Sequence, residues 1–148
     1  MNKVHHIGFT GTREGMSEYQ KYKLSGILQQ AMLLAASEGS ELVFHHGDCV
    51  GADAEAHAIA QSHKVNRIVI HPPKAKSHRA FCGKGESNVT WEEPEEYLER
   101  DRQIVDACEG MLAAPKSDIE ERRSGTWYTV RYARKMNKKA YLLPRTPV

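Results

Sequence analysis

Short apolar runs and longer amphipathic stretches alternate along the chain. The apolar runs at residues 4–9, 41–46, 66–71, 110–114 and 139–143 each stop at a turn that contains glycine or proline, which is typical of buried strands. Apolar side chains recur at helical spacing in residues 17–37, 52–62 and 125–136. This alternation predicts βαβ units, and therefore an α/β fold with a mostly parallel sheet of about five strands and helices on both faces.

Two stretches complete the pattern. A further helix is expected from Pro94, because proline is accepted in a first helical turn. It carries Tyr97, Leu98 and Ile104 towards a core. Residues 74–93 are polar and have no period, so we expect a long loop of the kind that often covers or binds a ligand.

The composition indicates one soluble globular domain spanning residues 1–148. Hydrophobic residues make up 40% and charged residues 27%, and the net charge of +2 is too small to indicate a nucleic-acid or membrane partner. Three cysteines are too few for a secreted disulfide scaffold, so we expect free thiols. No signal peptide or membrane-spanning run is evident, and a cytoplasmic location is expected.

Glycine, hydroxyl and charged residues gather directly after the first, second and fourth expected strands. The carboxyl ends of parallel strands meet at one edge of a sheet, where ligands of open α/β folds bind. With Arg79 from the long loop, the candidate ligand-binding residues are Gly8, Thr10, Gly11, Thr12, Arg13, Gly47, Asp48, Gly51, Asp53, Arg79, Arg123, Ser124, Gly125 and Thr126.

These residue types suit a phosphorylated ligand. Glycine lets a phosphate approach the backbone, and a helix that begins at Gly125 directs free N–H groups at an anion. Arg13 and Arg123 can add charge-assisted hydrogen bonds, and Asp48 or Asp53 can accept from ribose hydroxyls. The set predicts a site for a nucleotide or a phosphorylated sugar.

Plainer interpretations stay open for single residues. Ser124 and Asp53 could merely cap helices, and each glycine could serve a tight turn. Neither a Gly-Lys-Ser/Thr phosphate loop nor a full Gly-x-Gly-x-x-Gly fingerprint occurs, which disfavours NTPases and dinucleotide dehydrogenases. The histidines and cysteines lack zinc-site spacing, so no metal and no resident cofactor are expected.

Three segments together resemble the SLOG superfamily, which is named for the SMF/DprA proteins and the LOG phosphoribohydrolases. They are Gly8-Phe9-Thr10-Gly11-Thr12-Arg13, His46-Gly47-Asp48-Cys49-Val50-Gly51-Ala52-Asp53 and Arg123-Ser124-Gly125-Thr126. The resemblance covers nearly the whole chain and is strongest to the small stand-alone YspA-like branch. It implies a Rossmann-like sheet and a pocket for nucleotides or nucleotide-derived signals.

The same resemblance bears on catalysis. The hydrolases of the superfamily carry a His/Glu-Arg-Lys segment. In Glu99-Arg100-Asp101 the arginine matches and the lysine does not, so Arg100 joins the candidate ligand-binding residues. Their Gly-Gly-x-Gly-Thr-x-x-Glu motif ends here at Thr129 instead of glutamate. A threonine cannot supply a carboxylate for an oxocarbenium-like centre. The remaining catalytic candidates are Arg100, Asp48 and Glu14.

Three functions follow as alternatives. We expect a sensor or sequestering module for a nucleotide-derived, ADP-ribose-like small molecule. The second alternative is a nucleotide N-glycosidic hydrolase of the LOG type, and the third is a DNA-binding protein of the recombination-mediator type. The mild net charge makes nucleic acid the least favoured partner. A homo-oligomer, in the simplest case a dimer, is expected.

Overall fold

Six parallel strands form the centre of the molecule. The computed structural model describes residues 3–147. The sheet has the order β4-β3-β2-β1-β5-β6, and every neighbouring pair is parallel. The strands are β1 (Val4–Gly11), β2 (Glu41–His46), β3 (Arg67–Ile70), β4 (Val89–Trp91), β5 (Gly110–Ala114) and β6 (Lys139–Leu142). The predicted α/β class and parallel sheet are confirmed, with one strand more than expected.

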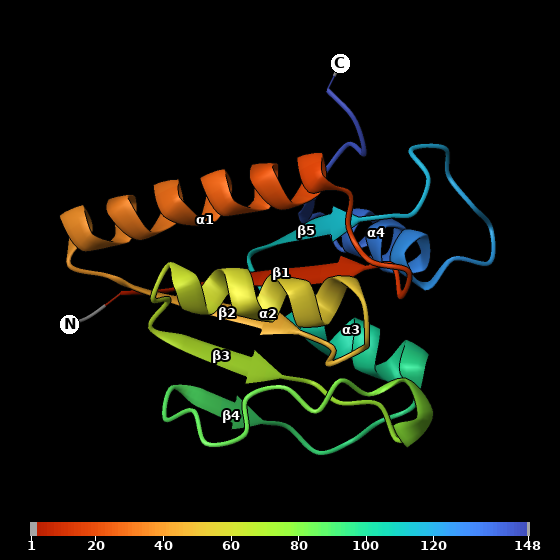
Figure 1. Ribbon diagram of the computed structural model, residues 1–148, viewed down its shortest axis with the longest axis horizontal. Coiled ribbons are helices and arrows are strands. Elements are labelled where there is room, and N and C mark those ends of the chain that lie inside the picture. The colour runs from red at the N-terminus through yellow and green to blue at the C-terminus, as the bar shows by residue number, and fades with distance from the viewer. Residues whose placement is uncertain (1–2, 148) are drawn as a thin grey trace.

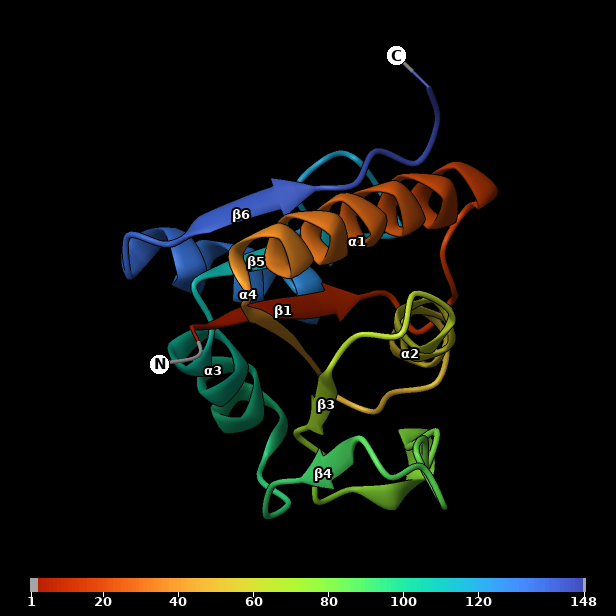
Figure 2. The ribbon, with the colours of Figure 1, turned by 90° about the vertical axis from the view of Figure 1, so that its left-hand side faces the viewer.

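Four helices cover both faces of this sheet, as predicted. Helices α1 (Glu18–Glu38) and α2 (Ala52–Ser62) lie on one face, and α3 (Tyr97–Ala107) and α4 (Gly125–Lys135) lie on the other (Figures 1 and 2). The larger core packs under α1 and α2 and contains Phe9, Leu24 and Phe44, all fully buried. Smaller cores under α3 and α4 complete a three-layer arrangement.

Local signals set the ends of several elements. Ser17 caps α1, since its hydroxyl accepts a hydrogen bond from the Gln20 amide and the Gln20 side chain binds the Ser17 amide in return. Gly39 ends the same helix at φ 69°, a left-handed conformation that glycine adopts without strain. Helix α3 departs from the prediction: it begins at Tyr97 rather than Pro94, and Leu98 is 49% exposed instead of entering a core.

The predicted loop over residues 74–93 is confirmed only in part. This segment contains a short 3₁₀ helix (Lys76–His78) and strand β4. It is tied to the body of the protein by Asp48, whose carboxylate accepts hydrogen bonds from Arg79 Nε and from the Cys82 amide, each at 2.9 Å. Strand β4 was not predicted because a strand of three residues is too short to show an alternation of apolar and polar positions.

Two further expectations concern membranes and thiols. Within residues 3–147 no helix is both long and apolar enough to cross a membrane. Cys49, Cys82 and Cys108 are all free, and burial raises the pKa of each thiol. The thiols therefore stay protonated and unreactive at neutral pH.

Candidate functional site

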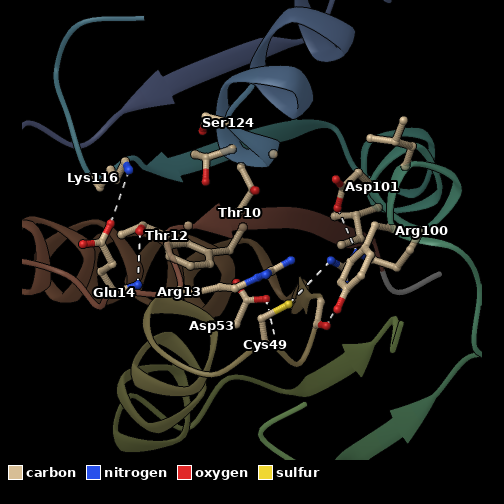
Figure 3. A pocket seen from close by; sticks show the side chains of 18 of the residues that line it. Thr10, Thr12, Arg13, Glu14, Cys49, Asp53, Arg100, Asp101, Lys116 and Ser124 are labelled. Atoms are coloured by element: carbon tan, nitrogen blue, oxygen red, sulfur yellow. Dashed lines mark hydrogen bonds and ion pairs between the residues drawn. The ribbon is translucent and has the colours of Figure 1, made fainter. Parts of the chain in front are cut away.

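A cavity of about 410 Å³ opens at the carboxyl ends of β1, β2 and β5. The turns that follow these strands, one face of α3 and the first turn of α4 form its walls, so segments far apart in the sequence meet there (Figure 3). The predicted residues that line it are Thr10, Gly11, Thr12, Arg13, Gly47, Asp53, Arg100, Arg123, Ser124, Gly125 and Thr126. The sheet edge predicted from the sequence thus coincides with a cavity.

Asp48 and Arg79 do not line this cavity. Asp48 is fully buried, and its carboxylate is bound to Arg79 Nε at 2.9 Å and to the Cys82 amide. Arg79 also lies over the Phe81 ring, with its guanidinium carbon 4.5 Å from the ring centroid. The left-handed backbone at Asp48, φ 60°, turns this side chain under the 74–93 segment. We therefore interpret Asp48 and Arg79 as structural anchors and remove them from the site.

Two predicted glycines serve packing rather than a ligand. A Cβ at Gly8 would overlap the Met111 and Cys108 side chains, so this glycine lets α3 approach β1 closely. Gly51 has φ 87°, and a Cβ there would collide with the Arg13 carbonyl. Neither glycine lines the cavity. Other atoms of the protein, and not a phosphate, pack against the backbone of these two glycines.

Arg100 is the central cation of the site. It is only 5% exposed and donates from Nε to Asp101 at 2.8 Å and from Nη1 to the carbonyls of Gly47 and His71. Nη2 lies 3.6 Å from the Cys49 sulfur. Burial lowers the pKa of Arg100, but Asp101 and other neighbours raise it by more. The pKa therefore lies above its usual value, and the guanidinium stays charged. These bonds hold a fixed positive charge against the cavity.

Asp53 presents an unsatisfied acceptor beside this cation. Its Oδ2 accepts from the Cys49 amide at 3.1 Å, whereas Oδ1 is buried and has no partner within the described chain. Burial raises the pKa of Asp53 to about 6, against the opposing effect of Arg100. Figure 3 shows its carboxylate beside Cys49 and Arg13. A buried acceptor without a partner is destabilising, and such groups need an explanation.

The first turn of α4 forms the opposite wall. Ser124 caps the helix, because its hydroxyl accepts from the Trp127 amide at 3.2 Å, which confirms the capping interpretation. Within residues 3–147 the amides of Gly125 and Thr126 make no hydrogen bond, and nothing lies within 4 Å of a Cβ built at Gly125. Two free N–H groups and the positive end of the helix dipole therefore face open space.

Charged side chains of both signs rim this wall. Lys116 lies 3.6 Å from Glu14 and 3.9 Å from Glu121, while Arg123 lines the cavity beside Ser124. Of the predicted catalytic candidates, Glu14 and Arg100 reach the cavity. Within residues 3–147, Arg123 and Arg13 form no ion pair with a carboxylate. Arg13 instead stacks on Tyr97, with its guanidinium carbon 5.0 Å from the ring centroid.

Helix α3 supplies half of the lining residues that sequence reasoning missed. Asp101 is buried, and burial raises its pKa while Arg100 opposes the rise. The usable signal was the position of Arg100 and Asp101 on the same helical face as Ile104, because charged residues on a core-facing stripe require a reason. The missed lining residues are Phe9, Cys49, Tyr97, Leu98, Asp101, Ile104, Lys116 and Glu121.

Basic side chains in the C-terminal part of the chain are engaged by other groups of the protein. Arg131 is paired with Glu120 at 2.9 Å, and Lys138 Nζ donates to the Val105 carbonyl at 2.7 Å. Trp127 is buried in a small core rather than available for stacking on a base. These contacts reduce the number of free cations that could meet phosphates.

One group of residues has the composition of a metal site. His46, His57 and Cys82 place ligand atoms within 4.8 Å of one another. The Asp48 amide donates to His46 Nδ1 at 3.0 Å, so His46 carries its proton on Nε2 and donates to His57 Nδ1 at 2.9 Å. His57 Nε2 then donates to Glu86 at 2.8 Å. A metal ion would have to displace these bonds, and the group is interpreted as a hydrogen-bonded chain.

Comparisons with known proteins bear on the fold. No protein-family model and no curated protein matches the sequence. Among solved structures, the chain resembles the molybdenum cofactor binding protein of Rippkaea orientalis, with 20% identity, a TM-score of 0.65 and coverage of 96% of this chain and 77% of that one. It also resembles the molybdenum cofactor carrier protein of Chlamydomonas reinhardtii, with 16% identity, a TM-score of 0.61 and coverage of 96% and 76%. These likenesses show a shared Rossmann-like fold.

Proposed function

We propose that the protein binds an anionic, nucleotide-derived small molecule in the cavity beyond β1, β2 and β5 and holds it without cleaving it. The observation that carries this proposal is the open first turn of α4, where the Gly125 and Thr126 amides have no partner and Arg123 lies beside them. A phosphate placed there would meet free N–H groups, the helix dipole and a guanidinium.

The other wall suits the sugar or base of such a ligand. The unpartnered Oδ1 of Asp53 would accept a hydrogen bond from a ribose hydroxyl or a base N–H group. Arg13 over the Tyr97 ring offers a flat cationic surface on which a base can stack. A cavity of about 410 Å³ is within the range that small-molecule sites occupy.

Three considerations favour binding over turnover. The two carboxylates at the deep end are constrained: Asp101 is held by Arg100, and Asp53 by the Cys49 amide. Thr129 is fully buried and donates to the Gly125 carbonyl at 2.9 Å, so it does not face the cavity. Two proteins of the same fold are named as molybdenum cofactor binding and carrier proteins, and carrying a ligand requires affinity and release but no chemistry.

The likeness in fold also agrees with the SLOG resemblance of the three motif segments. We therefore propose membership of this superfamily, in its stand-alone branch. Phosphorylated nucleotides and ADP-ribose-like molecules are the first ligands to test. The molybdenum cofactor, for which the two structural relatives are named, is the next ligand to test.

The experiment combines detection of a bound molecule with a matched pair of variants. Native mass spectrometry of the purified protein would report any small molecule that remains bound, and calorimetry with ADP-ribose and AMP would measure affinity. Arg123→Ala removes the cation beside α4, and Arg134→Ala, an exposed arginine at the far end of the same helix, is the control. We expect Arg123→Ala to weaken binding about 10- to 100-fold and Arg134→Ala to leave it unchanged.

Equal affinity of the two variants would remove the α4 wall from the site. If no molecule remains bound, if neither ADP-ribose nor AMP binds at millimolar concentration, and if the molybdenum cofactor does not bind, the binding proposal is wrong. Steady release of adenine or ribose from these ligands would replace it with the hydrolase alternative.

A further inference from the structure

A second cavity, of about 420 Å³, lies behind the wall of the first. It is lined by His71 after β3, Glu92 and Glu93 after β4, and Gln103, Asp106 and Ala107 on the outer part of α3. The segment that follows β4 leads into α3 (Figure 2). Arg100 separates the two cavities, since it lines the first and donates to the His71 carbonyl at 3.2 Å.

The lining of the second cavity is acidic, and the nearby Lys138 ammonium donates to the Asp106 backbone carbonyl at 3.1 Å rather than to a carboxylate. Glu92, Glu93 and Asp106 contribute three carboxylates, and no basic side chain lines the space. Within residues 3–147 none of the three forms an ion pair, although ion pairs are recorded for many other surface carboxylates. Asp106 Oδ1 accepts only a neutral donor, the Tyr132 hydroxyl at 2.9 Å. Carboxylates gathered without a cation repel one another and raise the local affinity for positive charge.

His71 adds an independent observation. It is 3% exposed, its amide donates to the His46 carbonyl, its carbonyl accepts from Arg100, and its Nε2 pairs with His45 Nδ1 at 2.8 Å. Its Nδ1 is the remaining polar atom, and it has no partner within the described chain. A buried polar atom without a partner needs an explanation, and the residue that carries this one lines the second cavity.

A row of hydrogen-bonded imidazoles can determine which ring nitrogen of His71 carries the proton. His45 Nε2 lies 2.9 Å from His6 Nδ1, so the three rings form one hydrogen-bonded row across the sheet. When each Nε2 donates to the next Nδ1, His71 Nδ1 is left with a free lone pair. Burial, with the nearby Arg100, lowers the pKa of His71 to about 4, which keeps the ring neutral and able to accept.

The spacing of the acceptors indicates the size of the ligand. The oxygen atoms of the three carboxylates and the His71 nitrogen are not among the described ligand groups that converge within 4.8 Å, whereas His46, His57 and Cys82 are. A metal ion needs ligands at about 2.0–2.6 Å and therefore a tight cluster. A cavity of about 420 Å³ with dispersed acceptors fits a larger cation whose donors are spread over several atoms.

We propose that this second cavity is a binding site for an organic cation that carries N–H donors, a guanidinium or polyamine group. Its N–H groups are shared between the His71 Nδ1 lone pair and the carboxylates of Glu92, Glu93 and Asp106. The site is independent of the anion site at α4.

The test uses spermidine and agmatine as probes. Substitution of solvent-exposed glutamates outside the cavity is the control. Calorimetry at low salt measures affinity, and long-range ¹H–¹⁵N spectra of the imidazoles follow His71 Nδ1. The double variant Glu92→Gln/Glu93→Gln removes two carboxylates from the cavity. The control Glu41→Gln/Glu99→Gln removes the same charge from exposed positions outside it. All four side chains are exposed, so folding is expected to be retained.

We expect at least one probe to bind, to shift the His71 Nδ1 resonance and to lose about tenfold in affinity in the cavity variant but not in the control. The proposal fails if neither probe shifts that resonance at millimolar concentration, or if both double variants lose affinity equally, which would indicate general charge attraction. Displacement of the probes by stoichiometric Zn²⁺ or Mn²⁺ at His71 would replace the organic cation with a metal ion. None of these outcomes depends on whether the first cavity binds a nucleotide.

Discussion

Replacing Asp53 by asparagine should make the protein more stable and less able to bind its ligand. The carboxylate is 4% exposed, and its Oδ1 has no partner. Asparagine has the same shape, can still accept from the Cys49 amide, and carries no charge to bury. The substitution therefore removes a destabilising charge and puts an N–H donor where the ligand meets an acceptor.

The magnitude follows from the pKa of Asp53. Burial raises this pKa from its usual 3.8 to about 6. Each pKa unit corresponds to about 1.4 kcal/mol, so ionised Asp53 lowers the free energy of unfolding by roughly 3 kcal/mol at pH 7 relative to its protonated form. Since the folded-state pKa is raised, the stabilising effect of the proton is complete below pH 3.8 and is lost as the pH rises through 6. Asparagine has no such dependence.

Urea unfolding of both proteins between pH 4 and pH 8 provides the measurement. We expect Asp53→Asn to gain about 2–3 kcal/mol over the parent at pH 7 and to lose that advantage towards pH 4. Glu41→Gln, at an exposed position, is the control and should change little at any pH. Calorimetry with ADP-ribose should show weaker binding to Asp53→Asn.

Two results would refute this reasoning. An Asp53→Asn protein that is less stable than the parent at pH 7 would mean that the carboxylate is paired in solution. A stability gain that is constant from pH 4 to pH 8 would mean that Asp53 does not titrate in this range. A gain in stability with unchanged ligand affinity would leave the pKa argument intact and remove Asp53 from the ligand site.

Three other predictions concern the first cavity and the two alternative functions. Gly125→Asp should abolish binding of ADP-ribose or AMP, because it places a carboxylate at the α4 N-terminus; the domain should stay folded, since nothing lies within 4 Å of the new Cβ. Calorimetry and circular dichroism check this against Gly26→Asp, an equally open glycine on α1, and unchanged affinity in folded Gly125→Asp would contradict it. Incubation with AMP should release no adenine at an enzymatic rate by chromatography, because Thr129 supplies no carboxylate; robust release that is lost in Glu14→Gln would show that Glu14 replaces it. Single-stranded DNA should bind weakly or not at all at physiological salt in a fluorescence titration, whereas a DNA-binding protein would show tight binding that falls about 0.7 log units per log salt for each phosphate contact.

The sequence by itself determined the order of the four α-helices and of every described strand except β4, and the edge at which the cavity lies. Strands such as Glu41–His46 and Gly110–Ala114 were predicted with their observed bounds, because an apolar run that ends at glycine or proline depends on local chemistry alone. The cap at Ser124 and the glycine stop at Gly39 are local in the same way. Parallel βαβ topology then brings the carboxyl ends of the strands to one edge without any knowledge of the packing.

The tertiary structure decided which of the polar residues at that edge face the cavity. Asp48 and Asp53 both follow β2, yet Asp48 is directed to Arg79 in a segment that joins the sheet through β4, whereas Asp53 keeps an unpartnered oxygen in the cavity. Arg100 and Asp101 enter the site from α3, a helix placed by its packing against β1 around Gly8. Contacts of this kind join residues about 30 to 100 positions apart, and local patterns carry no information about them because they form only when the layers pack.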